Sequence, residues 1–409
     1  MVVFAPGLLT GSACAGSGRT AVFCRDAATG NVVSGNAGGV FGTLLARLGH
    51  AALVIEGPSC PGAWQQLEIG PDTALFAPSS VAGLENSRAM AALALAYPQP
   101  HCFCTIGPAG EAGLPMANLA FGEDGGAPAS HAAGGAGAVM GAMKLKAVAL
   151  HDVPRRSPPM RDPGVFAEAA RCFASGLAEH ARRKPGSIRR RGCVPGCVVA
   201  CRDALPGTGK EGAGGKWPAY TSLWAGEILS DGTLSGRDRE MVRRYAALCD
   251  DLGLDAFGAG RILARMRGNG ALGKDPEDAL ALLRDLALFH NLALARDLAD
   301  GRAADVPGEV LRDAGSVPHA GHKLETADLP PDREGLEIAA LMDSLGVCLF
   351  AADAIRARPG ILAAVAAMGS AMHGQRMAEG DILSLGQRTL QLEADCGFSG
   401  GWRMPGGTS

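Results

Sequence analysis

The sequence has few aromatic residues, little excess charge and no long apolar run. Phe, Trp and Tyr make up 5% of its 409 residues, and charged residues make up 19%. Lys and Arg number 38 against 41 Asp and Glu, which gives a formal net charge of −3. Because binding to a nucleic-acid backbone or an anionic membrane requires a basic surface, this balance argues against both partners.

Three further absences narrow the class of protein. No apolar run, residues 90–96 included, approaches the roughly 18 residues that a membrane-spanning helix needs. The N-terminus lacks the basic start of a secretion signal, since its first cation is Arg19. A Walker sequence and a strand-linked Gly-x-Gly-x-x-Gly are also missing, which disfavours nucleotide binding. We therefore expect a cytoplasmic protein that is not integral to a membrane.

Glycine and cysteine are what the sequence has in quantity. There are 59 Gly and 12 Cys, and 47% of the residues are hydrophobic. A chain of this length buries enough surface to fold without disulfides or structural metals. In a reducing compartment the cysteines are therefore interpreted as metal ligands or as small buried residues.

The pattern of the sequence changes after residue 153. Before it, short β-type runs alternate with glycine, at residues 20–25, 51–57, 66–69, 102–107 and 147–152. After it come long amphipathic stretches, at residues 163–183, 235–251, 275–301, 332–350 and 379–396. The sequence predicts an α+β protein with a β-rich N-terminal base domain over residues 1–153 and a mainly helical region over residues 160–409. We expect that region to form one or two helical domains, the two covering about residues 160–330 and 331–409.

Three cysteines lie close together, at Cys193, Cys197 and Cys201. This spacing allows three thiolates to converge where a loop turns into a helix, and thiolate sulfur is the ligand of iron in a [4Fe–4S] cluster. The same spacing also places three small side chains on one helix face for packing, so both interpretations stay open. Cys102 and Cys104 alternate on an expected strand and are predicted to be core residues.

Two phrases share the pattern Asp-x-x-Gly-x-(Asp or Cys), at residues 250–255 and 343–348. In one interpretation they are ordinary helix ends, since glycine supplies the left-handed cap. An acid at the negative end of a helix dipole is unfavourable, however, which suggests that these carboxylates bind a ligand. A carboxylate can accept charge-assisted hydrogen bonds from the N–H edge of an amino-pyrimidine ring.

Glycine-rich segments in the first half offer bare backbone N–H groups. Such groups can bind phosphate, although tight turns in β-rich domains also collect glycine. The segments are residues 16–19, 34–39, 107–111 and 133–141.

Taken together, these phrases resemble the aldehyde ferredoxin oxidoreductase family, whose members carry tungsten on two pterin dithiolenes beside a [4Fe–4S] cluster. The likeness runs over most of the chain and keeps the family's order. The matching stretches are residues 7–19, 34–42, 48–57, 106–111, 134–146, 193–201, 250–260 and 343–350. The resemblance implies a β-rich base that supports the bis-pterin cofactor, with two helical domains closing over it.

The resemblance also implies roles for particular residues. The implied pterin-phosphate contacts are Arg19, Asn36 and Gly38, with a bridging Mg²⁺ at the Asn36 carbonyl, and the implied phosphate loop contains Gly134, Gly135 and Gly137. The implied pterin-edge carboxylates are Asp250, Asp255 and Asp343. The implied cluster ligands are Cys193, Cys197, Cys201 and Cys348. Tungsten, or molybdenum in its place, would be held by dithiolene sulfur and not by the protein.

The sequence departs from the family pattern at several places. Its cysteine spacing is C-x3-C-x3-C where the family has C-x2-C-x3-C, and Ala133 replaces a phosphate-binding Arg. Residues 216–221 align with the family's Gly-Pro-Glu-Tyr-Glu-Thr but contain neither acid, and a substrate-facing insert before Asp343 is short. The chain begins after the family's opening β-segment, so we expect an incomplete base unless a partner supplies the missing part.

The leading hypothesis is therefore a pterin and iron–sulfur oxidoreductase that oxidises an aldehyde or similar small substrate and passes electrons to ferredoxin. Its catalytic residues are not assigned, since His319 and His322, the nearest histidines, are interpreted as loop-surface residues. One alternative is a shortened paralogue that acts as an electron-transfer or structural subunit, in a homo- or hetero-oligomer. Another is a protein without any cofactor, against which the retained Asp250, Asp343 and Cys348 argue.

Overall fold

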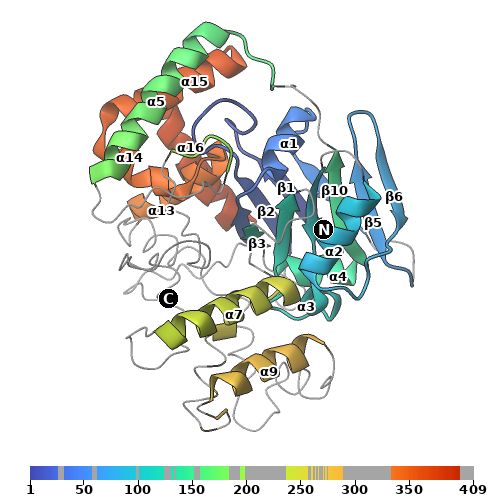
Figure 1. Ribbon diagram of the computed structural model, residues 1–409. Helices are drawn as coiled ribbons and strands as arrows, with labels where there is room; N and C mark the ends of the chain where they lie inside the picture. The colour runs from blue at the N-terminus through green and yellow to red at the C-terminus, as the bar shows by residue number, and fades with distance from the viewer. Residues whose placement is uncertain are drawn as a thin grey trace.

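Two β-sheets form the N-terminal part of the molecule and helices form most of the rest (Figure 1). This computed structural model describes residues 1–25, 32–57, 62–97, 101–123, 130–132, 135–151, 157–183, 194–198, 236–256, 275–288 and 333–396, together with a few single positions between residues 259 and 273. The α+β class that the sequence predicts, β-rich first and mainly helical afterwards, is confirmed.

The first sheet is antiparallel and four-stranded. Its strands are β1 (Val2–Pro6), β2 (Thr20–Arg25), β3 (Val32–Ala37) and β4 (Leu53–Ile55), in the order β3-β2-β1-β4. Period-two alternation buries Val2 and Phe4 on the inner face, as expected for a sheet that is covered on one side. Helix α1 (Phe41–Arg47) covers that face with Phe41 and Leu45.

The second sheet is mixed and six-stranded, in the order β6-β5-β10-β7-β8-β9. The bounds are β5 (Gln65–Ile69), β6 (Ala74–Pro78), β7 (His101–Thr105), β8 (Leu119–Glu123), β9 (Ser130–Ala132) and β10 (Leu145–His151). The helices between them are α2 (Asn86–Ala96), α3 (Pro108–Glu111) and α4 (Ala136–Ala142). The two sheets share one core, in which the ring of Phe41 lies 5.4 Å from that of Phe4 and 5.2 Å from that of Phe121.

The remaining helices form two groups. The larger group contains α5 (Pro163–Arg183), α13 (Arg333–Leu345), α14 (Ala352–Ala357), α15 (Pro359–His373) and α16 (Glu379–Asp395), with a 3-10 turn at Leu349–Ala351. The smaller group contains α7 (Gly236–Leu252) and α9 (Pro276–Ala287), which lie beside α3 in Figure 1. Asp275 caps α9 by accepting a 3.0 Å hydrogen bond from the Glu277 N–H, and Pro276 occupies its first turn.

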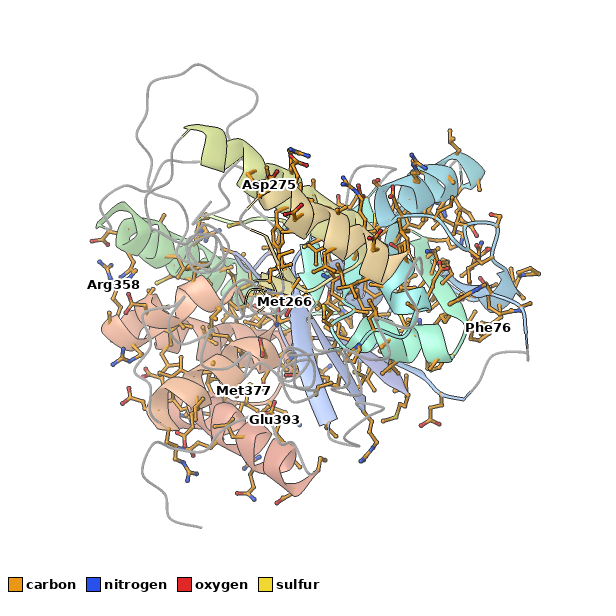
Figure 2. The ribbon with its side chains drawn as sticks, turned by 90° about the horizontal axis from the view of Figure 1, so that it is seen from below. Phe76, Met266, Asp275, Arg358, Met377 and Glu393 are labelled. Atoms are coloured by element: carbon orange, nitrogen blue, oxygen red, sulfur yellow. The ribbon has the colours of Figure 1, made fainter. Side chains whose placement is uncertain are left out.

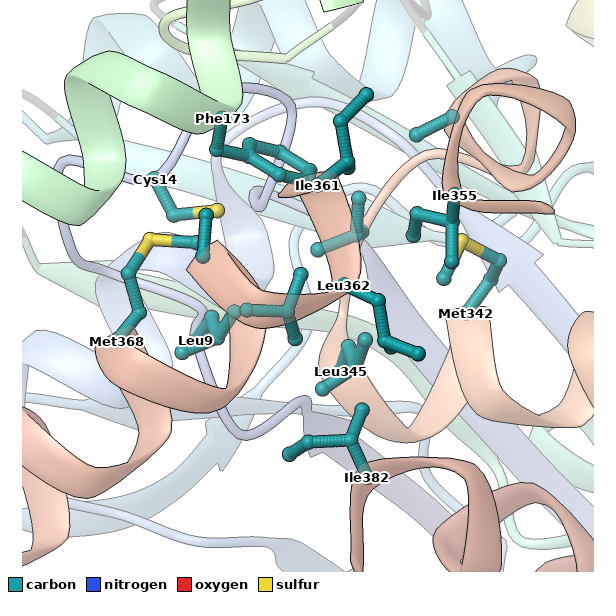
Figure 3. Close-up of a cluster of buried hydrophobic side chains, with 14 of the residues drawn as sticks. Leu9, Cys14, Phe173, Met342, Leu345, Ile355, Ile361, Leu362, Met368 and Ile382 are labelled. Atoms are coloured by element: carbon teal, nitrogen blue, oxygen red, sulfur yellow. The ribbon is translucent and has the colours of Figure 1, made fainter. Parts of the chain in front are cut away.

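The N-terminal loop after β1 is part of the core of the larger helical group. Leu9 and Cys14 from this loop are buried among Phe173, Leu345 and Met368 (Figure 3). Cys102 and Cys104 are 1% and 0% exposed on β7, which confirms their prediction as core residues. Among the helices described, none combines the length and the apolar character needed to cross a bilayer.

Candidate functional site

The turn after α13 meets the N-terminal loop at two glycines. Gly346 ends the helix in the left-handed region, with φ of 69°. A Cβ on Gly7 would lie 1.9 Å from the Gly346 nitrogen, and a Cβ on Gly346 would lie 2.0 Å from Oγ1 of Thr10. Only glycine therefore fits at either position.

Backbone hydrogen bonds fix this turn in place. The Leu8 and Leu9 N–H groups donate to the carbonyls of Ser344 and Leu345, at 2.9 and 3.1 Å. Arg19 N–H donates to the Gly346 carbonyl at 3.1 Å, and Cys348 N–H donates to the Gly16 carbonyl at 2.9 Å. Four bonds over so short a segment define the position of residues 343–348 against the base.

Three of the predicted site residues lie together at this turn. The Arg19 guanidinium donates through Nε to Oδ1 of Asn36 and through Nη2, at 3.0 Å, to the Asn36 carbonyl. The Asn36 amide in turn donates to Oδ1 of Asp343 at 2.6 Å. Arg19 precedes β2, Asn36 lies on β3 and Asp343 lies on α13. The hydrogen-bonded chain therefore joins the four-stranded sheet to the helical group, and it brings a cation and a carboxylate to one place.

The turn after α7 docks on the other sheet in a similar way. Gly253 has φ of 73°, and a Cβ on Gly107, which follows β7, would lie 2.3 Å from the Leu252 carbonyl oxygen. The Asn86 amide donates to the Asp250 carbonyl at 2.8 Å. The two Asp-x-x-Gly phrases thus have the same structural role. Each forms a helix C-terminus that packs on a glycine, Gly7 or Gly107, which follows a strand of the base.

Asn118 completes this second contact. Its backbone N–H donates to the Gly253 carbonyl and its side-chain amide to the Leu254 carbonyl, each at 2.8 Å, while Asp255 N–H donates to the Met116 carbonyl at 2.8 Å. Oδ1 of Asn118 is buried without a hydrogen-bond partner among the described residues. An orphaned acceptor of this kind beside Asp255 is a place for a ligand donor or an ordered water.

The predicted glycines differ in their surroundings. Gly38 and Gly39 are buried at the end of β3, yet a Cβ on Gly39 would meet no heavy atom within 4 Å. Gly135 begins α4 with φ of 75°. A Cβ on Gly137 would lie 2.4 Å from the Asn118 carbonyl, so its glycine is required by packing. Gly134 lies outside the described residues.

The predicted cluster ligands are only partly described. Cys348 is 7% exposed directly after the α13 turn, and Cys197 is partly exposed in the segment of residues 194–198. The loop that contains Gly16 and Gly18 touches both segments. A Cβ on Gly16 would lie 3.7 Å from the Cys348 Cβ, and one on Gly18 would lie 3.0 Å from the Val194 Cβ.

Cys193 and Cys201 lie outside the described part of the chain. Within that part, no group of three or more His, Cys, Asp or Glu side chains is arranged to hold a metal ion. The four-cysteine set therefore stays a prediction.

A buried ion pair behind the second turn was not predicted from the sequence. Lys146 on β10 is fully buried, and its ammonium donates to the carbonyls of Leu84 and Ile106 at 2.8 and 2.7 Å and to the Glu111 carboxylate. Burial lowers the pKa of Lys146, and the Glu111 carboxylate opposes that shift. Since Ile106 precedes Gly107, this pair holds the turn on which α7 docks. The available signal was a lysine inside an otherwise apolar strand.

Comparison with known proteins shows which family this chain is similar to. Residues 1–152 match a family model described as the N-terminal domain of aldehyde ferredoxin oxidoreductase. Tungsten-containing aldehyde ferredoxin oxidoreductases of Thermococcus kodakarensis and Pyrococcus furiosus are 28% and 26% identical to the chain over 315 residues. The alignment covers 64% of this chain and 49% of each relative, so the chain spans about half the length of these curated relatives.

The fold is shared with a solved oxidoreductase complex. The active site complex BamBC of benzoyl coenzyme A reductase, solved with 1,5-dienoyl-CoA, superposes with a TM-score of 0.70 at 16% identity. The match covers 98% of this chain and 81% of that one. At this identity the likeness shows a common fold. Over residues 1–152 the chain matches the aldehyde ferredoxin oxidoreductase family model, and over 315 residues it is similar to curated members of that family.

Proposed function

We propose that the chain binds a tungsten- or molybdenum-containing bis-pterin and a [4Fe–4S] cluster, and that it oxidises an aldehyde or similar small substrate with ferredoxin as electron acceptor. The observation that carries the proposal is the hydrogen-bonded chain from Arg19 through Asn36 to Asp343. It brings together a guanidinium, which we propose binds the phosphate, and a carboxylate, which we propose binds the edge of the pterin ring. In this proposal residues 1–153 are the base domain and residues 160–409 the helical region.

The residues present fit a phosphorylated pterin. Arg19 and the buried backbone at Gly38 and Gly39 are donors suited to a phosphate, and the open space beside Gly39 allows close approach. The carboxylates of Asp250, Asp255 and Asp343 are acceptors suited to the N–H edge of an amino-pyrimidine. The Asn36 carbonyl, proposed for Mg²⁺, accepts from Arg19 in this structure. Because a carbonyl oxygen has two lone pairs, this oxygen would still have one available to hold Mg²⁺.

The residues of the chain hold and orient these groups. Gly134, Gly135 and Gly137 would complete the phosphate loop, and Cys193, Cys197, Cys201 and Cys348 would hold the cluster. When bound, the metal–pterin group supplies two-electron redox chemistry and the cluster supplies one-electron transfer. Because Cys348 follows Asp343 in the same turn, one segment would contact both groups and fix their relative position.

A second candidate function is a cofactor-bearing subunit that transfers electrons without oxidising aldehydes. It is favoured by residues 216–221, which lack both acids of the corresponding family phrase. Oxidation of an aldehyde hydrate needs a proton acceptor near the reacting carbon. In this alternative a partner subunit would supply the substrate-facing groups.

Metal analysis of anaerobically purified protein tests the proposal. We expect about four iron atoms per chain for one [4Fe–4S] cluster, together with tungsten or molybdenum in a stoichiometric amount. Cys348→Ser should lose most of the iron, whereas Cys396→Ser, at an exposed cysteine, should keep it.

The outcomes separate the candidates. Iron far below stoichiometry after reconstitution would contradict the cluster, and unchanged iron in Cys348→Ser would contradict its proposed fourth ligand. If holoprotein contains both metals but does not reduce a viologen dye with any aldehyde, the subunit alternative replaces the enzyme.

A further inference from the structure

The outer strand of the six-stranded sheet is exposed on both of its faces. Within the described residues β6 has β5 on one side and no strand on the other. Leu75 and Phe76, which point to opposite faces, are 60% and 51% exposed. Phe76 lies at the margin of the molecule, on the side away from Met377 and Glu393 (Figure 2).

Edge strands of this kind are usually protected. Natural proteins place charged side chains, bulges or covering loops on an edge in order to prevent pairing with another chain. The five residues of β6 read Ala-Leu-Phe-Ala-Pro and carry no charge, and four of them are exposed. Its short length and Pro78 limit pairing, but among the described residues no element covers this edge, and Ala74 and Phe76 keep their N–H groups.

The hydrogen bonds to β5 show which groups of β6 face outward. Gly70 N–H donates to the Thr73 carbonyl at 2.9 Å, and Ser79 N–H donates to the Trp64 carbonyl at 2.8 Å. In an antiparallel pair, alternate residues bond to the neighbouring strand. Since positions 73 and 79 bond to β5, positions 75 and 77 do so as well. Positions 74, 76 and 78 therefore direct their backbone groups to the free edge.

These outward groups are self-complementary. Ala74 and Phe76 each present an N–H and a carbonyl, whereas Pro78 presents only a carbonyl. A two-fold axis through Phe76 allows two hydrogen bonds between the Phe76 residues of two copies. The same axis allows two more, from each Ala74 N–H to the Pro78 carbonyl of the other copy. All of the outward N–H groups of both strands are then used.

Side chains agree with the same register. It places the two Phe76 rings opposite each other and the large Leu75 opposite the small Ala77. Asp72, the nearest charged residue before the strand, falls opposite Ser80 of the other copy. No like charges meet, and aromatic pairs are favourable across antiparallel strands.

We propose that β6 is a self-association edge at which two copies of this chain pair antiparallel about Phe76. The pairing would join the two six-stranded sheets into one continuous sheet. A five-residue ladder buries less than the 1,200 Å² or more that stable complexes typically bury, so the dimer forms in a concentration-dependent equilibrium. The edge is a different surface from the turns after α7 and α13, and the proposal does not depend on any cofactor.

Sedimentation velocity of the full chain, from about 1 to 100 µM, tests the pairing. The wild-type mass should rise with concentration from 41.6 kDa toward twice that value. Phe76→Lys and Phe76→Glu should each stay monomeric, because the axis places two like charges opposite each other. An equimolar mixture of the two variants should associate again, since Lys then meets Glu. Leu95→Lys, at an 88% exposed site on α2, is the matched control and should behave as wild type.

Three results would overturn the proposal. They are a wild-type chain that is monomeric at about 100 µM, a dimer that persists in both Phe76 variants, and a mixture that fails to recover association. Circular dichroism of the variants should match wild type, because Phe76 is exposed and contributes little to the core.

Discussion

At the scale of single residues, the second turn depends on a charge that is taken out of water. Lys146 has no exposed surface, and all three groups that its ammonium contacts come from other segments, at Leu84, Ile106 and Glu111. The Glu111 carboxylate also accepts from the Gly83 N–H at 2.9 Å. The pair therefore fixes two loops and the strand β10 together.

Replacing Lys146 should show how much stability is lost when the partly buried Glu111 carboxylate has no cation beside it. We expect Lys146→Met to lower the free energy of unfolding by about 3 to 5 kcal/mol, since Glu111 stays partly buried without its cation. Adding Glu111→Gln should recover part of the loss, because it removes the unpaired charge. Urea denaturation at pH 7.5 measures both, with the exposed Arg88→Met as control. A Lys146→Met protein as stable as wild type would show that the pair contributes nothing.

The sequence indicated candidate site residues, but it did not indicate which of them form hydrogen bonds with one another. The family resemblance implied Arg19 and Asn36 as phosphate contacts and Asp343 as a pterin-edge carboxylate, and the structure joins the three by hydrogen bonds. Nothing in the local sequence predicts that Asn36 joins the other two, because its partners are 17 and 307 positions away. Long-range hydrogen bonds of this kind leave no periodic pattern.

At the scale of elements, helices could be predicted where apolar residues recur with the 3.6-residue period of an amphipathic helix. The stretch predicted at residues 163–183 is α5 with the same bounds, and that at 379–396 is α16. Helix α15 was not predicted, because Pro359–His373 is apolar on nearly every side and shows no 3.6-residue pattern. Strand β1 was missed because an apolar pentapeptide carries no signal of its partners.

The close contact between the α13 turn and the N-terminal loop can be tested by substituting Gly346. Gly346 and Gly113 both have φ of 69°, but only Gly346 has atoms within 4 Å of an added Cβ. Gly113→Ala should therefore cost only the left-handed strain of about 1 to 2 kcal/mol, whereas Gly346→Ala should also displace the turn. Hydrogen exchange at the Leu8 and Leu9 amides should speed up in Gly346→Ala alone. Equal protection in both variants would contradict this account of the contact.

At the scale of the whole molecule, three hydrophobic clusters each contain a buried thiol. Cys14 lies in the large helical cluster, Cys104 in the cluster between the sheets, and Cys249 on α7 in the cluster of the smaller helical group. Burial raises the pKa of Cys14 to about 12 and raises those of Cys104 and Cys249 well above the usual 9.0. The sequence predicted a β-rich base domain and a helical region, but it did not show that Cys14 from the N-terminal loop packs among C-terminal helices.

These thiols predict a loss of stability at alkaline pH. A raised pKa in the folded state means that stability is fully present below the unfolded-state pKa of about 8.5 and falls as pH rises above it. Each thiol should change the unfolding equilibrium constant by about tenfold per pH unit there. Lys146, whose pKa is lowered, acts in the opposite direction.

Urea denaturation in reductant at pH 7.5 and 9.5 measures the effect. The loss between the two should be smaller in Cys104→Ala and unchanged in Cys172→Ala, which alters an exposed cysteine. If Cys104→Ala loses as much stability as wild type over this interval, its thiol is not the source.

The hydrogen bonds between the N-terminal loop and the α13 turn also determine when folding can be completed during synthesis. Leu8 and Leu9 are translated long before Ser344 and Leu345, the residues whose carbonyls accept their hydrogen bonds. Until α13 has been translated, the base exposes those amides and the apolar Leu9 side chain to water. Closing so long a loop is slow and leaves surfaces open to aggregation. The nascent chain is therefore expected to need chaperone protection until α13 has been made.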